Sequence, residues 1–323
     1  MADNRVALVG LGDIGITAHL PALMRNPDVT VAAVADPVPA RRDAVVGVTA
    51  LPDLDAVLAD DTIGAVVLAT PPWVTTELAA IALRVGRFVL AEKPIAVSVA
   101  AAEPLRVIAP EVLARLQVGL TYRHDPAMER LRGWVTSGRL GGRLLCRAHI
   151  YDERRNPADT EHAARILADL RHGPPVMHEG SHVFDWLAYL FGGPPLSIED
   201  GWALRTGDIV NVNGARLTYP GGVTALTEFG WWTDRLPRCE LSILGDRGYA
   251  VLDCSTFSLT LDSADGRETV EFPGDRMARC FDRQLARFVD LITGRTDRAV
   301  PGFDEGLAAL RVSEQVAAAG KEA

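Results

Sequence analysis

The chain has 323 residues, a length that suits two domains, and its 48% apolar and 23% charged residues are typical of a soluble globular protein. Its net charge of −9 at pH 7 argues against nucleic acid or an anionic membrane surface as the main partner. The four cysteines have no C-x-x-C spacing and no apolar run approaches the roughly 18 residues of a membrane span, so we expect a cytoplasmic protein with reduced thiols.

The first predicted elements are a buried strand over residues 5–9, a glycine-rich turn and a helix that reaches Arg25. The turn follows the G-x-G-x-x-G pattern, and a second strand over residues 29–35 ends in an acid 21 residues after the last glycine. Such glycines allow a tight turn and the close approach of a pyrophosphate, and the helix N-terminus offers N–H groups to phosphates. The predicted dinucleotide-binding residues are Gly10, Gly12, Asp13, Ile14, Gly15, Asp36 and Arg41.

The predicted cofactor is NAD, with NADP as the alternative. Asp36 can accept a hydrogen bond from a ribose 2′-hydroxyl and would repel a 2′-phosphate. Arg41 and Arg42 follow closely, and they either flank a 2′-phosphate or face solvent on a helix. The sequence therefore favours NAD and leaves NADP open.

Two further strands end in residues that suit the same crevice. A strand over residues 65–69 precedes a Thr-Pro-Pro-Trp run, and a strand over residues 88–90 leads into a Glu-Lys-Pro run. Because an open parallel sheet binds ligands at the carboxyl ends of its strands, these runs should line one crevice with the glycine-rich turn. The two prolines could equally be a simple stiffening of a loop. The added cofactor-binding residues are Thr70, Pro71, Trp73, Glu92 and Lys93.

The composition singles out Lys93. Of the 33 basic residues, only Lys93 and Lys321 are lysines. A lysine at the end of an apolar strand indicates a need for a compact ammonium whose pKa shifts on burial, which a guanidinium does not provide. The alternative is a strand-end cation that pairs with Glu92.

The sequence resembles the Gfo/Idh/MocA family of NAD(P)-dependent oxidoreductases in five segments, which are residues 10–15, 69–72, 86–94, 119–126 and 180–185. The resemblance implies an α/β protein, in which an N-terminal Rossmann domain with a doubly wound parallel sheet precedes a C-terminal α+β domain with a large, open, mostly antiparallel sheet. We place these domains at residues 1–122 and 123–323. In the family, the lysine of the Glu-Lys-Pro run contacts the nicotinamide ribose and the substrate oxygen, which implies these roles for Lys93. By the same resemblance, Arg123 reaches the nicotinamide end or the substrate, unless it forms a local ion pair.

A helix is predicted over residues 176–191. Four polar residues lie at i, i+4, i+7 and i+11 and so share one stripe of this helix, namely His178, His182, Asp185 and Tyr189. The stripe is either a polar seam at a domain interface or, as we favour, part of a site in which His182 is the general acid/base. An imidazole titrates near neutral pH, and Lys93 needs a proton partner.

The family motif on this helix is Asp-x-Gly-x-His-x-x-Asp, and His178 replaces its first Asp. In relatives that Asp helps to bind the substrate or assists the catalytic histidine. An imidazole can hold a hydroxyl or relay a proton, but it cannot supply the negative charge. The resemblance implies catalytic roles for Lys93, His182 and His178, and substrate-binding roles for Lys93, Arg123, His178, His182 and Asp185.

Residues 178–182 also fit the H-E-x-x-H pattern of zinc proteases. Such a site needs a third protein ligand. Since no histidine follows His182, this ligand would be a carboxylate such as Glu199. Gly180 also weakens the helix on which the site would be built. We therefore expect no metal, and a zinc hydrolase is the less favoured alternative.

From residue 196 the pattern changes to short alternating strands separated by glycine-rich turns, expected at residues 209–219, 223–232, 238–244, 249–252 and 257–261. The polar segment 152–170 is expected to be a lid or a substrate loop. Amphipathic helices are expected at 277–292 and 303–319, and the second could pack back on the first domain. A homodimer or homotetramer through the sheet is expected, because large apolar sheet faces are seldom left exposed.

Together these features predict an NAD(P)-dependent oxidoreductase that transfers a hydride between nicotinamide and a secondary alcohol or ketone of a sugar, cyclitol or sugar derivative. Lys93 would polarise the substrate oxygen and His182 would exchange its proton. A diol or imine-type substrate is the alternative within the family. From another class, the chain could be a cofactor-binding regulatory protein that has lost catalysis. The expected partner is thus a small polyhydroxylated molecule.

Overall fold

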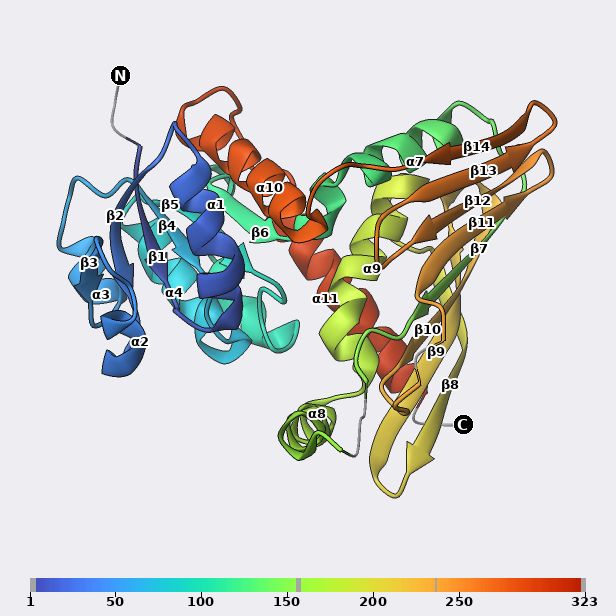
Figure 1. The fold of residues 1–323 in the computed structure, drawn as a ribbon, viewed down its shortest axis with the longest axis horizontal. Coiled ribbons are helices and arrows are strands. Elements are labelled where there is room, and N and C mark those ends of the chain that lie inside the picture. The colour runs from blue at the N-terminus through green and yellow to red at the C-terminus, as the bar shows by residue number, and fades with distance from the viewer. Residues whose placement is uncertain (1–3, 155–157, 236, 321–323) are drawn as a thin grey trace. The chain divides into compact units, whose positions relative to one another are not determined.

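The computed structural model describes residues 4–154, 158–235 and 237–320. The chain forms two compact units, each built from two stretches of sequence (Figure 1). The units consist of Met1–His124 with Gly274–Leu307, and of Asp125–Pro273 with Ala308–Ala323. Most of the second unit is therefore formed by a stretch of sequence that lies between the two stretches of the first unit. Within the described ranges, no helix combines the length and the apolarity needed to cross a bilayer.

The first unit is built on a six-stranded sheet, whose strands are β1 (Arg5–Val9), β2 (Thr30–Ala35), β3 (Thr49–Leu51), β4 (Ala65–Leu68), β5 (Phe88–Glu92) and β6 (Leu116–Gly119). Their order is β3-β2-β1-β4-β5-β6, and all neighbouring pairs are parallel. The order reverses between β1 and β4, which is the switch point where such sheets bind ligands. This confirms the predicted doubly wound sheet.

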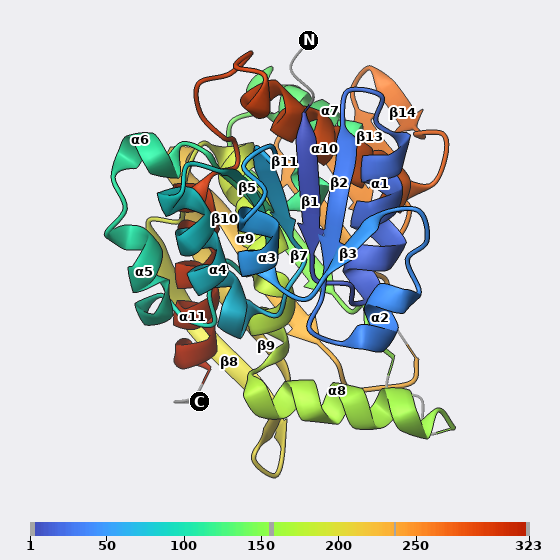
Figure 2. The same cartoon turned by 90° about the vertical axis from the view of Figure 1, so that its left-hand side faces the viewer.

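Helical segments join these strands, namely η1 (Gly15–His19), α1 (Leu20–Arg25), α2 (Pro39–Asp43), α3 (Leu54–Leu58), α4 (Pro72–Arg84), η2 (Ala100–Ala102), α5 (Glu103–Arg106), α6 (Pro110–Leu113) and η3 (Thr121–His124). Right-handed crossovers that start on either side of the switch point put their helices on opposite faces of the sheet. Accordingly, α1 and α4 lie on either side of the strands in Figure 2.

Helix α10 (Arg276–Ile292) belongs to the first unit, although the sequence placed this stretch in the second domain. Its residues Phe281, Leu285 and Phe288 are buried in the same apolar core as Val6 of β1. Burial of each such side chain contributes roughly 1.5–3 kcal/mol. An amphipathic pattern shows that a helix has a buried face, but it does not show which core receives that face.

The second unit is built on an eight-stranded sheet, whose strands are β7 (Leu144–Ile150), β8 (Ser197–Thr206), β9 (Ile209–Tyr219), β10 (Val223–Gly230), β11 (Glu240–Gly245), β12 (Gly248–Asp253), β13 (Leu259–Ser263) and β14 (Gly266–Val270). Their order is β14-β13-β12-β11-β7-β10-β9-β8. All neighbouring pairs are antiparallel except β7 with β10. This confirms the predicted, mostly antiparallel sheet. Its two edge strands, β8 and β14, were not among the expected strands.

The helical segments of the second unit are α7 (Pro126–Thr136), α8 (Thr160–His172), α9 (Pro175–Phe191), η4 (Pro220–Gly222) and the C-terminal part of α11 (Phe303–Ala319). Helix α8 occupies much of the polar segment that was expected as a lid or loop. Helix α9 packs on one face of the sheet through aromatic pairs. The ring centroids of Phe184 and Phe229 are 5.7 Å apart, and those of Phe191 and Tyr219 are 5.5 Å apart.

The two faces of this sheet differ in burial. Helices α7 and α9 run along one face in Figure 1, and the residues that point toward them are buried. Strand residues alternate between faces, and the opposite face exposes the apolar side chains Leu226, Leu244 and Tyr249 by 39%, 44% and 37%. An apolar surface of this kind is typical of a face that receives a partner.

Candidate active site

The glycine-rich turn connects β1 to η1 in the first unit. Gly10 has a φ of +97°, and a Cβ there would lie 2.3 Å from the carbonyl oxygen of Ala69. A Cβ at Gly15 would lie 2.2 Å from the carbonyl oxygen of Gly10, whereas one at Gly12 would have nothing within 4 Å. The outer glycines therefore let the turn close, and the middle glycine leaves open space beside it. This arrangement fits the pyrophosphate of a dinucleotide.

Asp36 holds this turn from the end of β2. Its side chain is buried, and its carboxylate accepts the N–H of Leu11 at 2.8 Å and the N–H of Val38 at 2.9 Å. Arg41 Nη1 lies 3.4 Å from Asp36 Oδ2, and Arg42 Nη1 donates to the Asp36 carbonyl oxygen at 2.6 Å. A carboxylate and two guanidinium groups thus lie together at one strand end. The carboxylate is the group expected to bind the ribose of NAD, and the guanidinium groups are those expected to bind the 2′-phosphate of NADP.

Replacing Gly12 by Ala is expected to weaken dinucleotide binding without changing the fold. The added methyl meets no protein atom within 4 Å, so it projects into the space beside the turn. We expect the Kd for NAD to rise at least about tenfold, or ~1.4 kcal/mol. The melting temperature should stay within about 2 °C of the wild type, because no contact is lost. Titration calorimetry and thermal denaturation measure these two quantities.

Gly15→Ala is the matched control for this variant. Its methyl would collide with the carbonyl oxygen of Gly10, so it should lower the melting temperature, whereas Gly12→Ala should not. An unchanged Kd in a folded Gly12→Ala protein would show that the turn does not hold the pyrophosphate.

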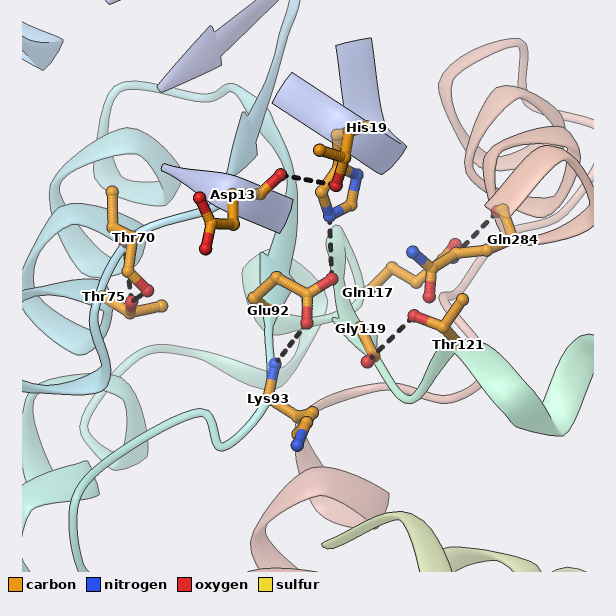
Figure 3. A network of polar contacts seen from close by, with 11 residues as sticks. Asp13, His19, Thr70, Thr75, Glu92, Lys93, Gln117, Gly119, Thr121 and Gln284 are labelled. Carbon is orange, nitrogen blue, oxygen red and sulfur yellow. Dashed lines mark hydrogen bonds and ion pairs between the residues drawn. The ribbon is translucent and has the colours of Figure 1, made fainter. Parts of the chain in front are cut away.

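A buried imidazole–carboxylate pair supports the end of β5 (Figure 3). His19 ends the π-helical turn η1, and its Nε2 lies 2.7 Å from Glu92 Oε1. The two residues are only 3% and 9% exposed. Glu92 Oε2 accepts the backbone N–H of Lys93 at 3.2 Å, and the Lys93 ammonium points away from this carboxylate in Figure 3. Glu92 therefore fixes the backbone from which the Lys93 side chain extends.

Two threonines of α4 hold the neighbouring strand ends. Thr75 Oγ1 lies 2.7 Å from Thr70 Oγ1 and donates to the Thr70 carbonyl oxygen at 2.9 Å. Thr76 Oγ1 donates at 2.8 Å to the carbonyl oxygen of Ile95, which follows the Glu-Lys-Pro run. The hydroxyls thus tie α4 to the segments that follow β4 and β5. These positions showed no signal of such a role in the sequence.

The predicted cofactor contacts all lie at or just after the carboxyl ends of strands in the first unit. They are Gly10, Gly12, Asp13, Ile14 and Gly15 after β1, Asp36 and Arg41 after β2, Thr70, Pro71 and Trp73 after β4, and Glu92 and Lys93 at β5. Trp73 is 72% exposed. The sheet topology brings these residues to one edge, and their contacts with a cofactor stay predictions.

Arg123 lies in η3, which follows β6, and it is mostly buried. Its neighbour His124 is also buried, and its carbonyl oxygen accepts a hydrogen bond from Arg283 Nε at 2.7 Å. Burial, followed by the positive charges of Arg123, Arg287 and Arg283, lowers the pKa of His124 to about 3. The imidazole is therefore neutral at physiological pH, and the end of β6 is rich in positive charge.

The predicted histidine stripe lies on α9 in the second unit. His182 and Asp185 are buried, with exposures of 6% and 2%. The His182 ring stacks toward Trp186 with 6.4 Å between centroids. His178, one turn earlier, is half-buried, and its Nε2 lies 3.2 Å from the carbonyl oxygen of Asp169 in α8. The structure thus places three predicted site residues on one helix, as their spacing indicated.

Asp152 is a candidate site residue that the sequence did not reveal. It lies just after β7 and is exposed to solvent. Trp231 Nε1 donates to Asp152 Oδ1 at 2.8 Å, and the same indole stacks on His178 with centroids 4.7 Å apart. Although the residue as a whole is exposed, desolvation of its carboxyl group by the surrounding protein, and then the Glu179 carboxylate, raise the pKa of Asp152 to about 8. A carboxyl, an indole and an imidazole therefore form one surface beside α9.

Glu199 is the carboxylate that a zinc site on the H-E-x-x-H run would need as its third ligand. Glu199 accepts a hydrogen bond from Arg216 at 2.6 Å, between β8 and β9. In the part of the chain that the structure describes, no three His, Cys, Asp or Glu side chains gather in a group that could hold a metal ion. Gly180 has a packing role, because a Cβ there would lie 2.5 Å from Ser313 Oγ in α11.

Comparison with known proteins finds matches in both units. Residues 4–120 match the family described as "Oxidoreductase family, NAD-binding Rossmann fold", and residues 128–251 match the "GFO/IDH/MocA C-terminal domain". The structure is similar to that of an oxidoreductase domain protein from Kribbella flavida, with a TM-score of 0.82 and 20% identity over 100% of this chain and 98% of that chain. At this identity the likeness shows a shared fold.

Two relatives are similar in sequence as well. The chain is 33% identical over 334 residues to inositol 2-dehydrogenase of Leifsonia xyli, covering 94% of this chain and 89% of the relative. It is 29% identical over 197 residues to inositol 2-dehydrogenase of Rhizobium meliloti, covering 60% of this chain and 57% of the relative. The chain thus spans less than two thirds of the length of the second relative.

Proposed function

The chain belongs to the GFO/IDH/MocA oxidoreductase family, and from this premise we propose that it is an NAD(P)-dependent dehydrogenase or ketoreductase. Its substrate is a secondary alcohol or ketone of a cyclitol, a sugar or a sugar derivative. The observation that carries the proposal is the position of Lys93 at the carboxyl end of β5, on the sheet edge that also holds the glycine cradle. The names of the two inositol 2-dehydrogenases support a polyhydroxylated ring as substrate.

The cofactor fits the residues at the end of β1 and β2, because the Gly12 side of the turn is open and Asp36 lies beside it. NAD is the favoured cofactor and NADP the alternative. Asp36 suits a ribose 2′-hydroxyl, whereas Arg41 and Arg42 are the groups that would bind a 2′-phosphate. When bound, the nicotinamide exchanges a hydride with the substrate carbon.

Lys93 and His182 then act on the substrate oxygen. The Lys93 ammonium donates a hydrogen bond to this oxygen and stabilises the negative charge that develops on it. The His182 imidazole removes the hydroxyl proton in oxidation and returns it in reduction. Glu92 positions Lys93 through the backbone N–H, and His19 holds Glu92 in place.

Two carboxyl groups lie near His178, one on α9 and one after β7. Asp152 and Glu179 lie close enough to influence each other, and Trp231 links Asp152 to His178. We propose that Asp152 and His178 bind ring hydroxyls, with Asp152 acting as a neutral, hydrogen-bond-donating carboxyl group at pH 7. Arg123 and Asp185 complete the proposed set of substrate contacts.

Replacing Asp152 by Asn is expected to remove a pH limit on the reaction. The pKa of Asp152 is raised to about 8, so the carboxyl is protonated at pH 7 and donates a hydrogen bond, and it ionises as the pH rises through that value. We therefore expect kcat/KM of the wild type to fall above about pH 8. The amide of an asparagine donates at every pH, so the Asp152→Asn variant should keep its kcat/KM within about threefold at pH 7 and lack the fall.

Steady-state kinetics between pH 6 and 9 measure this difference. Asp265→Asn, at an exposed hairpin tip, is the matched control and should keep the wild-type profile. A high-pH fall that persists unchanged in Asp152→Asn would assign it to another group.

The proposed function is tested with a panel of cyclitols and sugars in the presence of NAD or NADP. Turnover is followed by the absorbance of the reduced nicotinamide, and cofactor binding by calorimetry. Turnover of a ring alcohol with either cofactor supports the proposal. A protein that binds the cofactor but turns over none of the panel would favour the regulatory alternative, for which the replacement of the family Asp by His178 is the supporting observation. Absence of cofactor binding would overturn both.

We further propose a homodimer or homotetramer that forms through the outer face of the eight-stranded sheet. The exposed Leu226, Leu244 and Tyr249 support this, because an apolar strip on a sheet is seldom left in water. The net charge of −9 supports a small molecule rather than nucleic acid as the partner. A cytoplasmic location stays a prediction.

A further inference from the structure

Cys239 and Cys254 face each other at one end of the eight-stranded sheet. The antiparallel register of β11 and β12 pairs Glu240 with Asp253, so the next position pairs the two cysteines. The N–H of Cys254 donates to the carbonyl oxygen of Cys239 at 3.0 Å, which extends the ladder by one rung. Directly opposed residues of a hydrogen-bonded rung have Cα atoms about 5.5 Å apart. This separation lies within the usual range for a disulfide.

The two thiols also differ from the other cysteines in their surroundings. Cys239 is half-buried and Cys254 is 6% exposed. A hydrogen bond from the Cys254 thiol, and a weaker contribution from the backbone N–H of Tyr151, lower the pKa of Cys239. Cys146 and Cys280, by contrast, are fully buried, and burial raises the pKa of Cys146 far above its usual range. Reactive cysteines are partly accessible and have a stabilised thiolate.

We propose that Cys239 and Cys254 are a redox-modification site, at which hydrogen peroxide converts the two thiols to a cross-strand disulfide. Cys239 is the attacking residue and Cys254 the resolving residue. The proposal goes beyond the dehydrogenase reaction and does not depend on it.

The reaction needs only a peroxide as the two-electron oxidant. The Cys239 thiolate attacks one peroxide oxygen, the O–O bond breaks, and hydroxide leaves, which gives a sulfenic acid at Cys239. The Cys254 sulfur then attacks the Cys239 sulfur, an S–S bond forms, the S–O bond breaks, and water leaves with the Cys254 proton. In total the two thiols lose two electrons and two protons, and one peroxide becomes two waters.

The pair lies beside the candidate site of the second unit. The parallel ladder of β7 and β10 ends where Ile150 pairs with Phe229, and Asp152 and Trp231 lie two residues after this pair, where they are hydrogen-bonded to each other. In the antiparallel ladder of β7 and β11, His149 pairs with Glu240. The next position of this register places Cys239 opposite Ile150, two residues before Asp152. The Glu179 charge accordingly acts on both Asp152 and Cys239. Oxidation of this pair therefore changes the surface that holds Asp152.

The test is oxidation of the full-length protein with a small excess of hydrogen peroxide, followed by alkylation and non-reducing peptide mapping. We expect one cross-linked peptide that joins Cys239 to Cys254, with the loss of two hydrogen atoms and full reversal by dithiothreitol. Cys146 and Cys280 in the same sample are internal controls, and they should remain free thiols.

Two variants test the assigned roles. Cys239→Ser should abolish the cross-link and leave Cys254 a thiol. Cys254→Ser should lose the cross-link and let Cys239 proceed to sulfenic and sulfinic acid, since no resolving thiol remains. Circular dichroism checks that both variants are folded. The proposal is overturned if both cysteines stay reduced in the wild type under conditions that oxidise free cysteine, or if a disulfide forms between any other pair.

Discussion

Replacement of Lys93 by Met should lower kcat/KM by roughly 10²- to 10³-fold, because the transition state would lose the ammonium donor that we propose for it. Methionine has a similar volume and no charge, and Lys93 is only half-buried, so the fold should be retained. Since Glu92 still accepts the backbone N–H of residue 93, the strand end keeps its geometry. The Kd for NAD should change far less than kcat/KM, since Lys93 is only one of the predicted cofactor contacts, and this difference separates loss of chemistry from loss of binding. Initial rates and titration calorimetry provide both values.

Two companion variants sharpen this result. Lys321→Met removes the only other lysine in the sequence and should leave kcat/KM unchanged. Lys93→Arg keeps a positive charge, but its planar fork differs in geometry from an ammonium, so it should recover only a small part of the activity. A Lys93→Met protein with wild-type turnover would exclude the ammonium from the reaction, and a biological effect that survives loss of turnover would favour a regulatory protein.

Replacement of His182 by Ala should lower kcat by roughly 10²- to 10⁴-fold, which is the usual contribution of a general acid/base. The residue is 6% exposed and stacks toward Trp186, so the substitution also leaves a cavity in the unit. Added imidazole can enter this cavity and take up the proton, and part of the lost rate should return in proportion to its concentration. Kinetics of the variant with and without imidazole measure this rescue.

His178→Ala identifies which histidine of the stripe carries the proton. If His178 only binds a substrate hydroxyl, its loss should raise KM more than it lowers kcat, and imidazole should not restore the rate. His172→Ala, at the exposed end of α8, should behave as the wild type. Rescue of His178→Ala but not of His182→Ala would reverse the two roles.

The sequence was most informative where function and local backbone geometry coincide. The glycines at 10 and 15 have no room for a side chain, so their pattern directly reported the turn between β1 and η1. The stripe on α9 was likewise predictable, because residues three and four apart share a helix face. In both places the relevant neighbours lie within a few residues of each other along the chain.

The missed residues depend on contacts between distant segments. His19 meets Glu92 across 73 positions, and its only local signal is that it lies four residues after Gly15. Asp152 meets Trp231 because β7 and β10 pair in parallel, and no short-range pattern specifies the pairing of two strands so far apart. The edge strands β8 and β14 are largely exposed, so they lack the apolar alternation by which a strand is recognised.

The return of residues 274–307 to the first unit has a consequence for synthesis. Phe281, Leu285 and Phe288 complete its core, so the nascent chain cannot finish this unit when residue 124 leaves the ribosome. Another 183 residues must be translated before residue 307 is available, which takes roughly 10 to 40 s at about 5–20 residues per second. During that interval the apolar surface that α10 later covers stays exposed on the nascent chain. Chaperones that recognise apolar segments can bind it until α10 is made.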